Sequence, residues 1–441
     1  MNYKFLIPAL IFVFACNNKP ANINKDAVAS VSSDVEYIHA AEKKLTDIIV
    51  TDIFTPPVAS RVYVYPMIAA YEAGRFSKSG YNSLTSKMKG FDALPIPEKN
   101  KTYNFTIAAI KALCTTAKKV VFSTKVVDEF ETKTLSELKA GLTDTIIYNN
   151  SIAFGESVAN GIIKKLNTDY YKETRGMERF EVKDLVGRWT PTPPDYADGV
   201  EPNWAKMKTL VTDSAGQISA VKAAPYSEDI NNPFWKEVLE VHRISKSLTD
   251  EQENTISFWD DNPFVSRHRG HLMFQDKKMT PGGHWMAICQ LVLKENKSDF
   301  AESLQAYAVT SVALHEAFLS CWAEKYKSNR LRPETIISAK IEKQWHPFLI
   351  TPPFPSYTSG HSTVSAAAAE VLTNLFGNNF AYTDTTEKEY GLPVRSFTSF
   401  RQAALEASMS RLYAGIHFRS DCENGNKQGI KVGELVIKKL R

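Results

Sequence analysis

The sequence predicts an all-α fold, a helical bundle or bundles joined by long ordered loops. In three stretches the apolar residues recur at the spacing of one helix face. These stretches are Ile152–Leu166, Ser303–Lys325 and Val364–Phe376. The chain has 441 residues with 43% apolar content, which is enough for a sizeable core.

The first residues are typical of an export signal. Residues 1–16 contain Lys4, an apolar run too short to cross a bilayer stably, and Cys16. The run Val13-Phe-Ala-Cys16 resembles a bacterial lipobox, which would make Cys16 the lipidated first residue and residues 17–34 a polar tether. An ordinary cleaved signal is the alternative. We expect an exported protein, either lipid-anchored in the periplasm or at the outer membrane, or secreted.

Residues 35–441 are predicted to form a single all-α domain, with an N-terminal half at about 35–230 and an active-site half at about 231–441. The first half contains the periodicity of four or five packed helices up to Leu166, and the Tyr and Met residues between Tyr63 and Tyr71 are expected in its core. Residues 167–232 are interspersed with Pro, Gly and Asp and predict a long ordered loop that covers the bundle.

Further helices are expected in the second half. They should resume near Pro233 and Leu248, and Ser303–Lys325 is expected to be an amphipathic helix. Phe400–Tyr413 is a further Ala-rich helix, after which Gly415 breaks the run and His417 should open the last helix.

Charge and cysteine content exclude several classes of function. The net charge is +4, from 53 basic and 49 acidic residues without a basic run. The sequence therefore lacks the basic patch that is typical of nucleic-acid-binding proteins. The four other cysteines show no CxxC spacing and predict no metal–thiolate site. We expect Cys289 and Cys321 to be buried free thiols. The histidines His268, His271 and His284 lack zinc-ligand spacing on a helix and are expected to be hydrogen-bonded structural residues.

The chemistry of the chain is expected to converge on a pocket for a tetrahedral oxyanion. Such an anion needs several cationic or N–H donors in a dry site. Lys325, Arg332 and Arg411 would supply the charge. Ser359 and Gly360 precede an evident helix, whose first amides and macrodipole favour an anion. A lysine at the end of such a helix is usually exposed to solvent. Arg332-Pro, seven residues after Lys325, favours a place in the anion site instead.

Two histidines and a carboxylate complete the set. His361 and His417 lie in different segments and could take the two apical positions of a five-coordinate centre, one bonding the central atom and the other handling protons. Asp421 lies one helical turn after His417, where it could hold the ring in the required tautomer.

The three segments, Lys325-x6-Arg332-Pro, Ser359-Gly-His361 and Ser410-Arg-x5-His-x3-Asp421, resemble the phosphatidic acid phosphatase type two superfamily. Within it, the chain is most similar to the soluble vanadium-dependent haloperoxidases, in particular bacterial, iodoperoxidase-like members. Trp189-Thr-Pro-Thr-Pro-Pro and Thr280-Pro-Gly-Gly-His-Trp also look like bacterial members. The middle segment departs from the commonest pattern in having Thr358 in place of Pro.

The resemblance implies one vanadate per chain and oxidation of halide by hydrogen peroxide to hypohalous acid. His417 would coordinate vanadium, and His361 would take the proton from hydrogen peroxide. Trp322 and Phe354 would line the halide pocket. Iodide is expected to be the best substrate, because it is the easiest halide to oxidise and loses least hydration at an apolar wall. The cofactor oxygens would be held by Lys325, Arg332, Ser359, Gly360 and Arg411.

Two other functions use the same residues. A soluble acid phosphatase would employ His417 as nucleophile, His361 as proton donor to the leaving group and Asp421 to orient His417. The same pocket could serve either reaction, because vanadate resembles the five-coordinate transition state of phosphoryl transfer. A lipid-anchored protein that binds anions without turnover is the third possibility, although binding alone would not require an acid–base pair.

Overall fold

The computed structural model describes residues 25–440 except 184, 264–265, 270–271 and 276–277, and gives only the backbone of residues 25–33, 266–269 and 272–275. The described residues form fourteen α-helices and two short hairpins, so the predicted all-α fold is confirmed. The strands are β1 (Ser266–Arg269), β2 (Leu272–Gln275), β3 (Tyr382–Asp384) and β4 (Arg395–Phe397), paired antiparallel as β1–β2 and β3–β4.

The helices are α1 (Lys25–Thr51), α2 (Pro56–Gly74), α3 (Phe105–Ala117), α4 (Thr124–Ala140), α5 (Thr145–Leu166), α6 (Tyr171–Arg175), α7 (Pro233–Ser245), α8 (Asp250–Phe258), α9 (Pro281–Glu295), α10 (Phe300–Ser328), α11 (Pro333–Lys340), α12 (Gly360–Phe376), α13 (Phe400–Tyr413) and α14 (Arg419–Leu440). The predicted helix over Phe400–Tyr413 has the expected bounds.

The predicted export signal at residues 1–16 lies outside the described residues. Of the predicted tether, residues 25–34 belong to the first turns of α1. None of the described helices is long and apolar enough to span a membrane.

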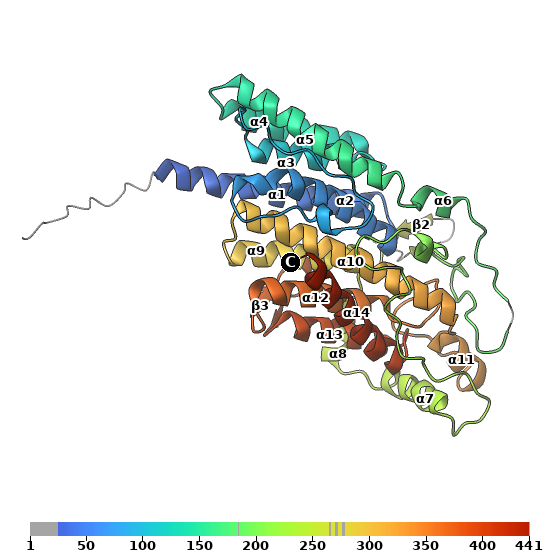
Figure 1. Cartoon of the computed structure of the whole chain (residues 1–441). Coiled ribbons are helices and arrows are strands. Elements are labelled where there is room, and N and C mark those ends of the chain that lie inside the picture. The colour runs from blue at the N-terminus through green and yellow to red at the C-terminus, as the bar shows by residue number, and fades with distance from the viewer. Residues whose placement is uncertain (1–24, 184, 264–265, 270–271, 276–277, 441) are drawn as a thin grey trace, which may run out of the picture.

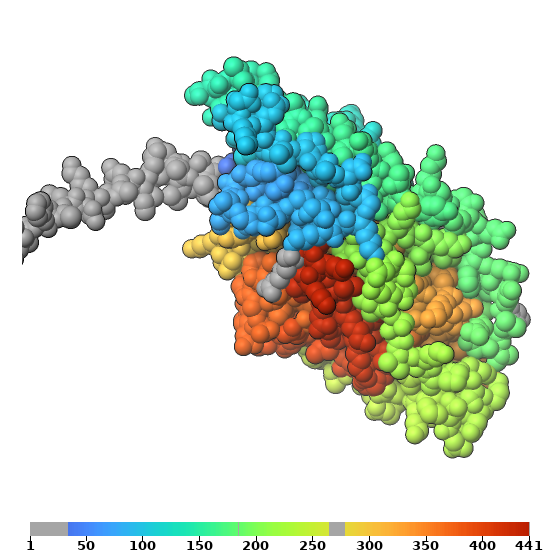
Figure 2. Space-filling view, in the orientation of Figure 1, coloured from blue at the N-terminus to red at the C-terminus, as the bar shows by residue number. Residues whose placement is uncertain are grey.

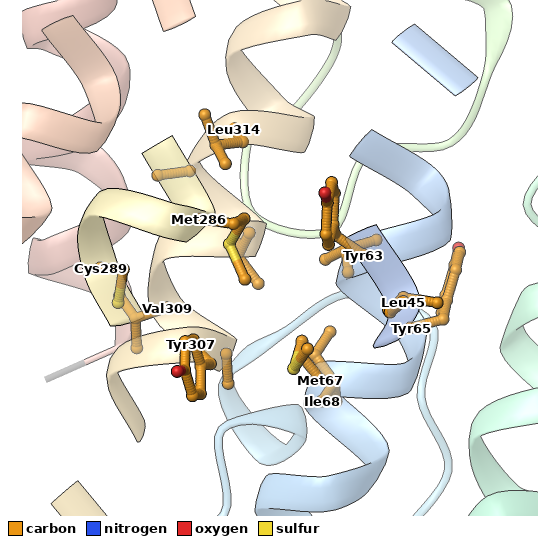
Figure 3. Packing of buried hydrophobic residues seen from close by; sticks show 14 of the residues in the cluster. Leu45, Tyr63, Tyr65, Met67, Ile68, Met286, Cys289, Tyr307, Val309 and Leu314 are labelled. Atoms are coloured by element: carbon orange, nitrogen blue, oxygen red, sulfur yellow. The ribbon is translucent and has the colours of Figure 1, made fainter. Parts of the chain in front are cut away.

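The N-terminal half forms one layer of the molecule. Helices α1 to α5 lie together on one side of α9 and α10 (Figure 1), as the four or five packed helices predicted for this half. Tyr63, Tyr65 and Met67 of α2 are at most 1% exposed, which confirms their predicted place in the core (Figure 3), and α2 packs against α9 and α10. One hydrophobic core therefore extends across both halves.

Helix α10 lies between the two halves. It contacts α2 on one side and α12 and α14 on the other (Figure 1). Nearly all of its residues from Phe300 to Lys325 are buried, so the expectation of an amphipathic helix is wrong. Ala, Ser and Thr residues, which resemble a polar face in the sequence, are small enough to be enclosed between neighbouring helices.

A row of glycines brings α14 against α12. Gly425, Gly429 and Gly433 recur every fourth residue and face the α12 backbone. A Cβ atom at Gly429 would lie only 2.1 Å from the carbonyl oxygen of Thr363. This close approach places the start of α14 beside the start of α12, where the Ser359 N–H donates to the Asp421 carbonyl at 3.0 Å.

The described residues of segment 167–232 contain only α6 and a short 3-10 helix, in agreement with the predicted long loop. Its green residues in Figure 2 border the orange active-site half. The N–H of Val200 donates to the Pro353 carbonyl, and the N–H of Trp189 donates to the Asn329 carbonyl. The loop is therefore hydrogen-bonded to the segments that carry the predicted anion site.

Candidate active site

The first two predicted cations come from the end of α10 and the start of α11. Asn329, in the left-handed conformation at φ 45°, ends α10 three residues before Arg332. Arg332 precedes Pro333, the first residue of α11, where proline's missing N–H costs nothing. Both Lys325 and Arg332 are fully buried. The turn between the helices thus directs two cationic side chains into the interior.

Neutral groups are the hydrogen-bond partners of these cations. The Lys325 Nζ donates to the carbonyls of Pro355 and Ser356 at 3.0 and 3.1 Å. The Arg332 guanidinium donates to the carbonyls of Phe354 and Ile416 at 2.9 and 2.8 Å. Burial lowers the pKa of Lys325 to about 7 and that of Arg332 to about 9. Both side chains therefore gain from a nearby anion.

Arg411 of α13 supplies the third cation. It is 2% exposed, and its Nη1 donates to the Trp259 carbonyl at 2.6 Å. Its Nε finds no hydrogen-bond partner among the described residues. Within the described part of the chain, neither Lys325, Arg332 nor Arg411 has a carboxylate oxygen within 4.0 Å. A buried cation without such a partner is costly unless an anion binds.

The N-terminus of α12 faces the same region. Ser359 caps the helix, and its Oγ accepts the N–H of Ser362 at 3.3 Å. Among the described residues this hydroxyl has no hydrogen-bond acceptor, so it can donate to a ligand. A Cβ at Gly360 would lie 3.6 Å from the Trp322 ring, so a side chain here would fill space beside the cavity. His361 lies in the first turn of α12, as predicted.

His417 is held by Asp421. Its Nδ1 lies 3.2 Å from Asp421 Oδ2, and its Nε2 lies 3.1 Å from Nη1 of Arg332. Burial and the Arg332 guanidinium hold the pKa of His417 well below its usual value. The ring is therefore neutral, with Nδ1 protonated toward the carboxylate and the Nε2 lone pair turned toward the cations.

His417 does not open the last helix, as had been expected, but lies two residues before α14 begins at Arg419. The reason is that Asp421 Oδ2 also accepts the Phe418 N–H at 3.1 Å, so one carboxylate binds both the ring and the backbone before the helix.

His361 has a different environment. Its Nε2 has no hydrogen-bond partner among the described residues and lies 3.8 Å from Asp261 Oδ2. Burial and the neighbouring Arg411 lower the pKa of His361 well below its usual value. The neutral ring can accept a proton from a group bound in the cavity.

One cavity brings part of the predicted set together. Gly360, His361, Arg411 and His417 line it, and the predicted halide-pocket residues Trp322 and Phe354 form an apolar wall with Phe318. The remaining predicted residues are not among its lining residues; these are Lys325, Arg332, Ser359 and Asp421.

The wall lies directly against the cations. The rings of Trp322 and Phe354 lie 5.1 Å apart. Lys325 Nζ lies 4.8 Å from the centre of the Phe354 ring, and the indole N–H of Trp322 donates to the Val200 carbonyl at 3.1 Å. The long loop thus holds one side of the wall in place.

Comparisons with known proteins agree with this geometry. Residues 305–441, which include every predicted site residue, match a family model described as the VCPO second helical-bundle domain. No curated protein matches the sequence. The crystal structure of the first bacterial vanadium-dependent iodoperoxidase is 43% identical, with a TM-score of 0.87 and coverage of 92% of this chain and 96% of that chain. This chain belongs to the vanadium-dependent haloperoxidases.

Two further structures share the haloperoxidase fold. The holo and apo crystal structures of a bacterial vanadium-dependent chloroperoxidase align with TM-scores of 0.62 and 0.63 at 16% and 15% identity. Each alignment covers 88% of this chain and 93% or 95% of the other. At this identity they establish the common fold alone.

The structure of this haloperoxidase also reveals supporting residues that the sequence did not single out. Asp421 accepts hydrogen bonds from Arg330 at 2.6 Å and from the Ser356 hydroxyl at 2.5 Å. Although burial opposes ionisation, Arg330 and these hydrogen bonds keep the pKa of Asp421 below its usual value. Arg330 could have been suspected only from its place two residues before Arg332.

Proposed function

We propose that this protein binds vanadate and uses it to oxidise halide, iodide in preference, with hydrogen peroxide to hypohalous acid. The observation that carries the proposal is the group of three buried cations, Lys325, Arg332 and Arg411, without a carboxylate within ion-pair distance in the described part of the chain. Arg411 lines one cavity together with Gly360 and His361 of the α12 N-terminus, which adds unpaired N–H groups for an anion.

The residues fit vanadate as a tetrahedral oxyanion. Lys325, Arg332 and Arg411 would hold its oxygens together with the Ser359 hydroxyl and the Gly360 N–H. The unpartnered Arg411 Nε and His361 Nε2 are buried polar atoms that a bound oxyanion and its substrate would satisfy. When bound, vanadate would activate hydrogen peroxide, which is the two-electron oxidant of the halide.

The two histidines have separate roles in this proposal. The Nε2 lone pair of His417 is suited to coordinate vanadium, because Asp421 fixes the proton on Nδ1. His361 is neutral and would take a proton from hydrogen peroxide. Asp421 acts through His417 as a positioning residue.

The apolar wall favours iodide. Trp322 and Phe354 offer no hydrogen-bond donor to a halide except the indole N–H, which the Val200 carbonyl already accepts. A large polarisable anion loses less hydration at such a wall than a small one. Bromide-oxidising algal relatives resemble one another in having a second histidine at the place of Phe354, whereas chloride-oxidising fungal relatives also have Phe there.

The test is to load vanadium-free protein with orthovanadate and measure kcat/KM for iodide, bromide and chloride at saturating peroxide, alongside hydrolysis of a phosphate ester. We expect halide oxidation only in the loaded protein, with iodide first and chloride scarcely oxidised, and inhibition by phosphate, which competes for the site. Full iodide oxidation without vanadium would refute the cofactor. Ester hydrolysis without halide oxidation would favour the acid phosphatase, and anion binding without either activity the non-catalytic binding protein.

Two matched pairs of variants sharpen this test. Lys325→Ala should lose vanadate binding, whereas Lys327→Ala, whose side chain is 68% exposed near the end of α10, should retain it. Phe354→His should raise the bromide-to-iodide ratio of kcat/KM, whereas Phe348→His, at a position 47% exposed, should leave it unchanged. A wild-type bromide value at or above that for iodide would overturn the assigned preference.

We also propose that the protein is exported and anchored through a lipid on Cys16. The support is the lipobox-like Val13–Cys16 sequence, which lies outside the described residues. The Cys16→Ser variant should move from the membrane fraction to the soluble fraction. An unchanged distribution would leave an ordinary cleaved signal as the better explanation.

A further inference from the structure

A second cluster of buried polar groups adjoins the anion cavity, which its member Asp261 also lines, and has no role in the proposed reaction. It contains His284 in the first turns of α9 and three carboxylates from separate segments. Asp261 follows α8, Asp384 ends β3, and Glu387 lies in the next 3-10 turn. All four side chains are at most 4% exposed. The cluster therefore gathers buried oxygen and nitrogen atoms of the kinds that bind divalent cations around one imidazole ring.

Asp384 fixes the orientation of the histidine. Its Oδ1 accepts two hydrogen bonds from Thr386, from the backbone N–H at 2.9 Å and from the hydroxyl at 2.7 Å. Its Oδ2 lies 3.1 Å from Nε2 of His284. A carboxylate can only accept, so Nε2 carries a proton and Nδ1 is the atom turned toward Asp261 and Glu387.

The atoms around Nδ1 have the arrangement of a ligand set. Nδ1 lies 3.0 and 3.2 Å from the two oxygens of Asp261 and 3.8 Å from Oε1 of Glu387. The potential ligand atoms of these residues all lie within 4.8 Å of one another. Ligand atoms bound to one zinc ion at about 2.0–2.1 Å in a tetrahedron are separated by roughly 3.3 Å. A cation between them would need only small side-chain shifts.

Glu387 provides an independent reason for a cation. Its Oε1 is buried and has no hydrogen-bond partner among the described residues. If Nδ1 carried a proton instead, that proton would serve Asp261, at 3.0 Å, and would leave Glu387 Oε1 without a donor. His284 stacks on Trp259 with ring centres 4.6 Å apart, which is compatible with a protonated ring. This stacking supplies no hydrogen-bond donor to Glu387 Oε1.

We propose that Asp261, Nδ1 of His284 and Glu387 bind one divalent transition-metal cation of the zinc class, with Asp384 as the outer partner of the histidine. Imidazole nitrogen and carboxylate oxygen are both ligands for such ions, and a carboxylate on the other ring nitrogen is the usual means of orienting a ligand histidine. His284 then has a role beyond the structural hydrogen bonding that its sequence context predicts.

This site is distinct from the vanadate site, because it binds a cation through carboxylates rather than an anion through cations. The two are neighbours, since Asp261 Oδ2 lies 3.8 Å from His361 Nε2. Zinc binding can therefore be measured in vanadium-free protein and does not depend on halide oxidation. Failure of either proposal leaves the other to be judged on its own measurement.

The test treats the full mature protein with chelator, adds zinc, removes free metal by gel filtration and measures the metal retained. Wild-type protein should retain about one zinc per chain and show a higher Tm with zinc than without. Glu387→Gln and His284→Gln should bind zinc at least about tenfold more weakly. Glu389→Gln, in the same 3-10 turn but 42% exposed, and His417→Ala should bind it like wild type.

Cobalt substitution gives a second measurement. Cobalt-loaded wild-type protein should show the visible d–d absorption of a low-symmetry nitrogen–oxygen site, and Glu387→Gln should lose it while retaining its far-UV circular dichroism. If His284→Gln does not fold, Glu387→Gln alone decides. Wild-type protein that retains no zinc, or a Glu387→Gln variant that binds zinc as tightly as wild type, would overturn the proposal.

Discussion

The Nδ1 atom of His417 lies 3.2 Å from a carboxylate oxygen of Asp421, and that carboxylate is itself held by Arg330 and Ser356. Three side chains from three segments thus fix the tautomer of one imidazole. Because the pKa of His417 is well below its usual value, the ring presents a lone pair rather than a proton to the cations around Arg332.

The first prediction concerns this support. Asp421→Asn should weaken vanadate binding by about 10- to 100-fold, because the amide can no longer hold the Nδ1 proton with a full charge. It should also destabilise the protein by about 3 kcal/mol, the lower end for breaking a buried pair, since Arg330 keeps Glu237 as a partner. Equilibrium dialysis and urea unfolding measure the two effects. The control is Glu423→Gln, two residues further along α14 and 51% exposed, which should change neither.

The second prediction separates the two histidines. His417→Ala should abolish vanadate binding, because it removes the coordinating nitrogen. His361→Ala should keep much of the binding and lose turnover, because it removes the proton acceptor. Vanadium content after gel filtration and peroxidase rates distinguish the cases. His346→Ala, at a side chain 70% exposed, should behave as wild type. Equal loss of vanadium from both site variants would contradict the division of roles.

The third prediction follows from the pKa of about 7 that burial imposes on Lys325 in the anion-free protein. A bound anion raises this pKa, so binding above pH 7 takes up a proton. Affinity for sulfate, whose charge is constant in this range, should be steady below pH 7 and fall by up to about tenfold per pH unit above it.

The two site histidines do not contribute to this dependence, because their pKa values lie well below the usual range. Lys325→Arg keeps its positive charge over this pH range, so its affinity for sulfate should change less with pH. Calorimetry in two buffers of different ionisation enthalpy measures the proton uptake. A wild-type affinity that is constant or rises with pH would refute the assignment.

The fourth prediction concerns the contact between α12 and α14. Gly429→Ala should lower the free energy of unfolding by about 1–3 kcal/mol, because the added Cβ would overlap the Thr363 carbonyl and force the helices apart. The higher helix propensity of Ala opposes this loss by about 1 kcal/mol. Gly216→Ala, where nothing lies within 4 Å of the new Cβ, is the matched control. Urea unfolding measures the free energy of unfolding of both variants. Equal values for Gly429→Ala and Gly216→Ala would show that the close approach of the helices does not contribute to stability.

The sequence by itself determined the helices with clear periodicity, and it predicted the residues that are proposed for the anion site. Phe400–Tyr413 has its predicted bounds because caps and apolar spacing are local properties of the chain. Likewise, the four-residue spacing of His417 and Asp421 brings the ring and the carboxylate together across one turn. The oxyanion chemistry could be predicted because cations, a helix N-terminus and two histidines are recognisable wherever the segments lie in space.

Only the tertiary structure decided the surroundings of these residues. Arg330 meets Asp421 across 91 residues because α10 packs against α14. Glu387 approaches His284 because α9 packs against β3 and the 3-10 turn that follows it. The enclosure of α10 on all sides also depends on that packing, since Ala, Ser and Thr carry no sign in the sequence of whether they face water or a neighbouring helix. The spacing of residues along the chain determines which face of a helix a side chain occupies. The packing of the helices determines which residues that face contacts.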